Sequence, residues 1–198
     1  MTKQIPKRAV TAVAMGMMLM AIFTLWWTSL IAYGFPNVFG FSVQAAFTIL
    51  VFVLGYESIR TFRLAKRFPK TTNAADKAQG KHIGKAYGII FGTEGAAIGA
   101  ASAILGTTGH DKLVIPVIAL IVGLHFYPMA TLFRRTIDYY LASWVCLVAT
   151  VGIVLTVKTA IPEPKIWSGV GFGVACATVI YGLYMRWYVG KHFRAQNP

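Results

Sequence analysis

The chain has 198 residues, of which 57% are hydrophobic and only 13% are charged. Soluble domains carry about 25% charged residues, so the composition argues against an ordinary soluble enzyme and against a disordered tail. The 19 Lys and Arg against 6 Asp and Glu give a net charge of +13. A protein that binds nucleic acid displays such charge on a polar surface, and this sequence has too little polar surface for that partner.

Six apolar runs follow one another along the chain, each long enough for a helix that spans a bilayer. They are separated by turn residues such as Gly34 and Pro36, or Pro162 and Pro164. A transmembrane barrel would alternate polar and apolar residues, and these runs do not. The sequence therefore predicts an all-α, polytopic membrane protein, a six-helix bundle in one integral membrane domain over residues 1–198. The predicted helices cover about 9–33, 42–63, 83–105, 113–133, 139–157 and 166–189.

Basic residues collect in alternate connections between these runs. With six spans, the N-terminus, the second loop, the fourth loop and the C-terminus share one side, and they hold 16 of the 19 Lys and Arg, Lys3 included. The positive-inside rule then predicts that both termini are cytoplasmic. The second loop, about 64–82, is interpreted as a topology determinant with snorkelling side chains. The alternative is a patch for lipid headgroups or another anionic ligand.

Ionisable residues inside apolar helices are expensive and mark ion or substrate paths. Glu94 lies 11 residues into the third predicted helix, about 16 Å deep and near mid-membrane. His125 lies 8 residues from the inner end of the fourth, about 12 Å deep. A short loop joins these two helices, so we expect them to be antiparallel neighbours that bring Glu94 and His125 to similar depths. A structural hydrogen bond between helices is the alternative role for both residues.

Further candidate residues surround this pair in the sequence. Pro128 lacks the N–H that would bond to the carbonyl of Leu124, and it is expected to kink the fourth helix. Tyr127 precedes it, and Tyr87 shares a helical face with Glu94. Tyr87, Tyr127 and Pro128 complete the predicted ligand- or proton-binding site.

Glu57 lies near the inner end of the second predicted helix. Arg60 follows at i+3, so the two side chains can pair on one face. The structural interpretation of Glu57 is this intrahelical pair. If the second helix touched the third and fourth, Glu57 would instead continue a line from mid-membrane to the cytoplasm.

Small residues form stripes on the third and sixth predicted helices. Close helix packing is the first interpretation of such a stripe, and homo-oligomerisation is the second. The residues are Gly84, Gly88, Gly92, Gly95, Gly99 and Ser102 on the third helix, and Gly169, Gly171 and Gly173 on the sixth.

The sequence contains no P-loop, no GxSxG, no HExxH and no GxGxxG before a strand. The usual motifs for nucleotide use or hydrolysis are therefore missing, and an enzyme is the less favoured class. The sequence identifies no cofactor. Glu57, Glu94 and His125 are of metal-ligand type, and the sequence leaves open whether they converge.

The stretch Pro116 to Ala130, with Gly88 to Gly95 upstream, resembles a group of small bacterial six-helix inner-membrane proteins of uncharacterised activity. The resemblance covers mainly residues 84–130. It implies a multi-pass protein of the bacterial inner (plasma) membrane, and it implies no activity.

These observations predict a small transporter- or channel-like protein whose partners are the lipid bilayer and a small ion or small-molecule substrate. Glu94 is the protonatable or cation-binding group, His125 its partner and Glu57 a cytoplasmic relay. Two alternatives remain: a membrane scaffold or accessory subunit, and a membrane enzyme or cofactor-binding protein that uses His125.

Overall fold

The computed structural model describes residues 5–70 and 74–194, without the side chains of residues 74–76 and 194; Lys3 and residues 71–73 of the predicted second loop lie outside the described residues. Within this part of the chain the secondary structure is helical, with no strand. The long helices are α1 (Lys7–Gly34), α2 (Val38–Ala65), α3 (Ala74–Thr107), α4 (Val114–Phe133), α5 (Thr136–Lys158) and α6 (Glu163–Val189). Two short segments are η1 (Asp111–Leu113), a 3-10 turn before α4, and η2 (Gly190–Arg194), a π-helical extension of α6.

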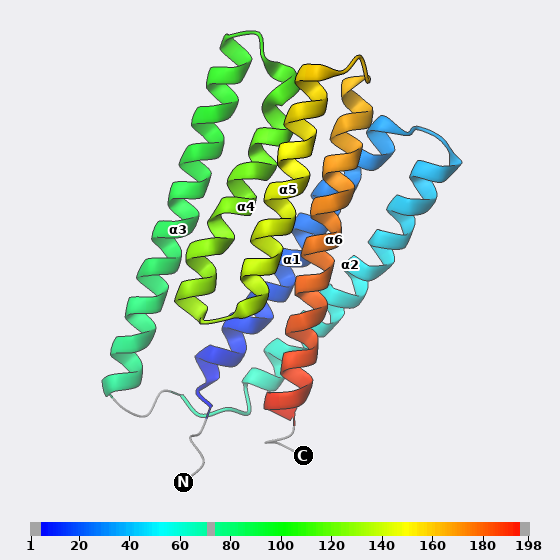
Figure 1. Ribbon diagram of the computed structural model, residues 1–198. Coiled ribbons are helices and arrows are strands. Elements are labelled where there is room, and N and C mark those ends of the chain that lie inside the picture. The colour runs from blue at the N-terminus through cyan, green and yellow to red at the C-terminus, as the bar shows by residue number, and fades with distance from the viewer. Residues whose placement is uncertain (1–4, 71–73, 195–198) are drawn as a thin grey trace.

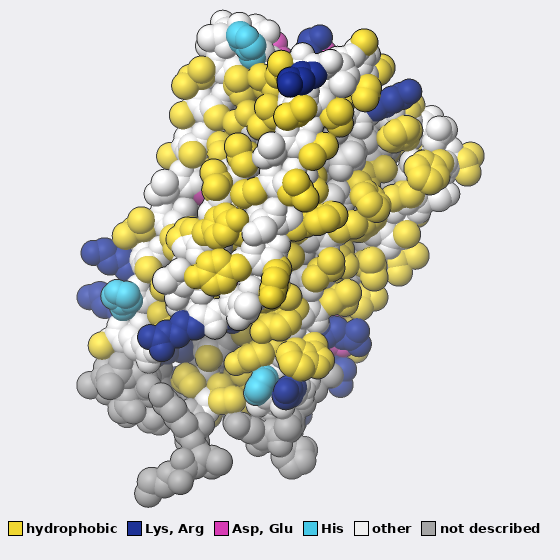
Figure 2. Space-filling model, viewed as in Figure 1, with side chains coloured by type: hydrophobic (Ala, Val, Ile, Leu, Met, Phe, Trp, Pro, Cys, Tyr) yellow, Lys and Arg dark blue, Asp and Glu magenta, His cyan; other side chains and the backbone are white. Residues whose placement is uncertain are grey.

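All six long helices are long and apolar enough to cross a membrane. This confirms the predicted all-α bundle of six helices that are capable of spanning a membrane. The helices run up and down in one elongated bundle (Figure 1), so α1 begins and α6 ends at the same end. We call this the basic end, because it carries most of the described Lys and Arg side chains. Hydrophobic side chains cover the middle of the face shown in Figure 2, and the dark-blue cations lie toward its two ends.

The largest difference from the predicted boundaries is at α3, which begins at Ala74 and not near residue 83. The added turns carry exposed polar side chains, among them Lys77, Lys81 and His82. Hydropathy reports the segment that fits the lipid layer, whereas backbone hydrogen bonding continues the helix beyond it. The predicted second loop is therefore partly helical.

α6 lies at the centre of the bundle and α3 lies at its edge (Figure 1). α6 packs against α1 and α5 and makes smaller contacts with α2 and α4, whereas α3 packs mainly against α4. In the most apolar window of each helix, 67% of α6 is buried inside the chain and none of α3 is. The site described below lies between this edge helix and α4.

The two glycine stripes have different environments. Close packing is confirmed on α6, where a Cβ on Gly171 would lie 2.6 Å from the carbonyl oxygen of Trp27 and a Cβ on Gly173 would lie 2.7 Å from Val148. At Gly169 a Cβ would meet open space. On α3 the prediction of close packing within this chain is wrong, because the five glycines of the stripe also face open space. The reason is that α3 meets α4 through its other face, which carries Glu94.

Candidate functional site

The structure brings Glu94 of α3 and His125 of α4 into contact. Oε1 of Glu94 lies 3.3 Å from Nδ1 of His125, and both side chains are only 10% exposed. The antiparallel α3–α4 hairpin produces this contact, since it places Glu94 and His125 at similar depths on facing helices. The pair lies within helices that are long and apolar enough to cross a membrane.

Aromatic rings pack around the pair from both helices. Phe91, one turn before Glu94, has its ring centroid 5.5 Å from that of His125, and Tyr87 stacks on Phe91 at 4.5 Å. On the α4 side, Phe126 lies 4.3 Å from the imidazole. The Tyr87 side chain is also within range of an electrostatic interaction with the Glu94 carboxylate. The predicted grouping of Tyr87 with Glu94 on one helical face agrees with this geometry.

The contact between the pair is close but is not a well-formed hydrogen bond. Among the described residues, Nδ1 of His125 is a buried nitrogen without a partner in hydrogen-bond geometry. The carbonyl of Val122, three residues earlier on α4, also interacts with the imidazole. Buried polar atoms in native proteins are nearly always satisfied, so we expect a water molecule, an ion or a proton shared with Glu94 to complete the bonding of this nitrogen.

Pro128 and Tyr127 lie on the same helix as His125 and are exposed. α4 is helical on both sides of Pro128. The Tyr127 hydroxyl lies 3.1 Å from Oγ of Ser143 on α5. Tyr127 therefore belongs to the contact between α4 and α5, whereas Glu94 and His125 belong to the contact between α3 and α4.

Glu57 is separate from the pair. α2 packs against α1 and α6 and not appreciably against α3 or α4, so the condition for a line from Glu94 through Glu57 is not met. Its Oε1 lies 3.8 Å from Nη1 of Arg60 and 3.5 Å from Nε of Arg186 on α6. The predicted pairing with Arg60 is present. Arg186 is a second cation near Glu57, and it was not predicted because it lies far from Glu57 in the sequence.

Sequence reasoning missed a second buried acid, Asp138, in the first turn of α5. Asp138 is fully buried, and neither of its oxygens has hydrogen-bond geometry with a partner among the described residues. The Tyr181 hydroxyl and the Arg135 guanidinium lie near its carboxylate, and Nη1 of Arg135 donates to Oη of Tyr181 over 3.4 Å. Phe126 connects this cluster to the pair, because its ring packs on both His125 and Tyr181. The signal was available in the sequence: an acid at the start of an apolar run, one residue outside the predicted helix.

The described residues contain no group of three His, Cys, Asp or Glu that could hold a metal ion. A metal site built from Glu57, Glu94 and His125 is thus not assembled. A cavity is present, but it lies at the basic end and is lined by residues of α1 and the α2–α3 linker, not by the pair.

No protein-family model, curated protein or solved structure matches the chain.

Proposed function

We propose that the chain is a small transporter- or channel-like membrane protein in which Glu94 and His125 together bind a proton or a cation. The observation that carries the proposal is the 3.3 Å contact between a carboxylate oxygen and an imidazole nitrogen that has no other well-formed partner among the described residues. Ionisable side chains inside a membrane are costly and are associated with ion paths. An acid paired with a titratable base also differs from an acid paired with a fixed charge, because the pair can gain or lose a proton.

The proposed chemistry follows from counting charges. With one shared proton the pair is neutral overall, whether the proton resides on Glu94 or on His125, and neutrality is favoured in an apolar interface. Loss of that proton leaves one negative charge, which a monovalent cation can neutralise. The same two side chains can therefore exchange a proton for a cation.

The test is flux in proteoliposomes that carry an internal pH indicator or a cation-sensitive dye. Glu94→Gln preserves size and hydrogen bonding but cannot ionise, and His125→Gln removes the titratable base. We expect both variants to reduce flux to the level of protein-free vesicles. Tyr127→Phe is the matched control, since it lies on α4 but contacts Ser143 of α5, and it should retain wild-type flux. Unchanged flux in both Glu94→Gln and His125→Gln contradicts the proposal.

A second candidate function is a scaffold or accessory subunit in which the pair fastens α3 to the bundle. The supporting observation is that α3 packs mainly against α4, so a polar contact in that interface stabilises an otherwise weakly attached helix. This role predicts that Glu94→Gln and His125→Gln lower the stability of the folded protein while ion flux is absent in the wild type as well.

We also infer the orientation and the membrane. The basic end carries the cations of the N-terminal segment and of the second and fourth connections, and the positive-inside rule assigns such an end to the cytoplasm. Together with the resemblance over residues 84–130, this supports a bacterial inner membrane. Reporter fusions after Lys158 and after Arg194 should report opposite sides of the membrane.

A further inference from the structure

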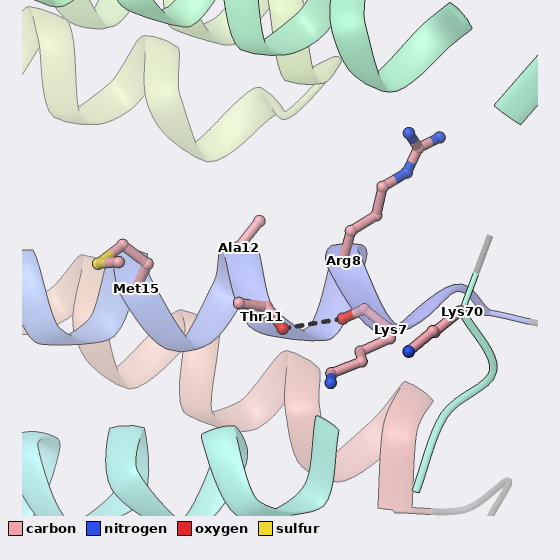
Figure 3. A pocket seen from close by; sticks show the side chains of 6 residues that line it. All are labelled: Lys7, Arg8, Thr11, Ala12, Met15 and Lys70. Carbon is pink, nitrogen blue, oxygen red and sulfur yellow. Dashed lines mark hydrogen bonds between the residues drawn. The ribbon is translucent and has the colours of Figure 1, made fainter. Parts of the chain in front are cut away.

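A cavity of about 520 Å³ opens at the basic end of the bundle, beside the first two turns of α1 (Figure 3). Its volume is within the range of small-molecule sites in proteins, about 300–1,000 Å³. Three of its lining residues are cations and the others are small or apolar: Lys7, Arg8, Thr11, Ala12, Met15 and Lys70.

The position of Lys70 depends on main-chain and core contacts of the α2–α3 linker. The backbone N–H of Lys7 donates to the carbonyl of Pro69 over 2.9 Å, which ties the linker to the first turn of α1. Phe68 is buried and packs edge-on against Phe193 at 6.1 Å. In Figure 3 the ammonium groups of Lys7 and Lys70 extend to the same side of α1. The linker is thus held at Phe68 and at Pro69, directly before Lys70.

Arg8 extends from another side of α1 and reaches α3 (Figure 3). Its guanidinium packs so closely on Gly80 that a Cβ at that position would overlap it. Glycine at residue 80 therefore leaves room for the Arg8 side chain. Lys7 and Lys70 therefore bring one cation from α1 and one from the linker to the same side of the cavity, and Arg8 lines the cavity toward the start of α3.

The three cations are not neutralised by the rest of the described chain. No described carboxylate lies within ion-pair distance of Lys7, Arg8 or Lys70. Lys7 and Arg8 are half-buried, so their charges are less screened than those of a fully exposed lysine. The start of α1 adds the positive end of the helix dipole.

The remaining lining extends along α1 in the direction of the apolar layer. Ala12 and Met15 follow Arg8 at about one-turn intervals and are exposed, Met15 to 51%. The Thr11 hydroxyl is bonded to the carbonyl of Lys7 over 3.1 Å, within its own helix. A ligand that uses the whole cavity therefore has an anionic head beside the cations and an apolar tail along Ala12 and Met15.

We propose that this cavity binds the phosphate headgroup of an anionic phospholipid, with Lys7 and Lys70 contacting the phosphate, with Arg8 adding positive charge on the side toward α3, and with an acyl chain lying along Ala12 and Met15. The negative charge matches three cations that have no described carboxylate within ion-pair distance, and the amphiphilic ligand matches a lining that changes from charged to apolar along α1. The site is independent of Glu94 and His125, so its failure and that of the flux proposal are separate results.

The experiment measures protection of the purified protein against thermal unfolding in a neutral detergent. The probes are short-chain phosphatidylglycerol, short-chain phosphatidylcholine and inorganic phosphate, each titrated at constant ionic strength. We expect phosphatidylglycerol to raise the unfolding midpoint at concentrations at which the other two have no effect. Since one basic residue near an anionic membrane surface is worth about 1 kcal/mol, or roughly fivefold in affinity, Lys7→Gln and Lys70→Gln should each weaken the apparent Kd about fivefold.

Two further variants separate a built site from general attraction. Lys66→Gln removes an exposed cation of the same linker that does not line the cavity, and it should leave the apparent Kd unchanged. Ala12→Leu adds bulk to the exposed apolar lining without a change of charge, and it should weaken binding of phosphatidylglycerol. Equal weakening by Lys66→Gln, equal protection by phosphatidylcholine, or equal protection by inorganic phosphate each overturns the assignment to an anionic lipid.

Discussion

The contact between Glu94 and His125 has a measurable energy, the coupling free energy of unfolding in a double-mutant cycle. The cycle compares Glu94→Gln, His125→Gln and the double variant with the wild type. Two unit charges at 3.3 Å attract by about 5 kcal/mol at an effective dielectric constant of about 20. Desolvation of two nearly buried ionic groups costs several kcal/mol and offsets most of this attraction. We therefore expect a coupling free energy of about 1–2 kcal/mol.

The expected coupling lies at the upper end of the range for polar contacts between membrane helices, which average about 0.6 kcal/mol and reach about 1.7 kcal/mol. The assay is reversible unfolding in mixed micelles, followed by the near-ultraviolet signal of the aromatic side chains. Tyr127→Phe combined with His125→Gln is the control, and its effects should add within about 0.5 kcal/mol. A coupling for Glu94 and His125 within that same error refutes the contact.

The remaining predictions use the same unfolding assay. Gly171→Val should destabilise the protein by about 1–3 kcal/mol, because its Cβ would lie 2.6 Å from a main-chain carbonyl oxygen of α1. Gly92→Ala should stabilise it by about 0.5–1 kcal/mol, because the new methyl group meets open space; a loss of stability contradicts that environment. Tyr181→Phe should cost about 1–3 kcal/mol, because its buried hydroxyl lies beside Asp138. Tyr184→Phe removes a hydroxyl from the same helix outside this cluster and should be close to neutral.

The number of helices and their apolar spans could be predicted from the sequence, because the thickness of the bilayer fixes how long an apolar run must be. The helix ends were predicted less well, since hydropathy marks the lipid layer and hydrogen bonding does not stop there. At α3, exposed lysines such as Lys77 and Lys81 belong to the helix. The similar depths of Glu94 and His125 on neighbouring helices were also predicted, because a short connection joins α3 and α4, whereas the sequence left open whether the two side chains touch.

The arrangement of non-consecutive helices could not be predicted in the same way. In a membrane helix, residues that face lipid and residues that face protein are equally apolar, so the sequence does not distinguish the central α6 from the peripheral α3. The contact of Glu57 with Arg186 depends on that arrangement, and so does the burial of Asp138 against Tyr181. The glycine stripe of α3 shows the same limit, because small residues favour close packing only where a second helix is present.

The environments of Glu57 and Glu94 explain why we assign the exchangeable proton to one acid and not to the other. Both are shielded carboxylates on apolar helices, but Glu57 lies between the guanidinium groups of Arg60 and Arg186. Arginine keeps its charge under all physiological conditions, so Glu57 faces two fixed positive charges on side chains that are about half exposed. Glu94 contacts an imidazole, which can take up the proton that the carboxylate releases. A fixed counter-charge suits a structural ion pair between α2 and α6, whereas a titratable partner suits a site whose charge changes during function.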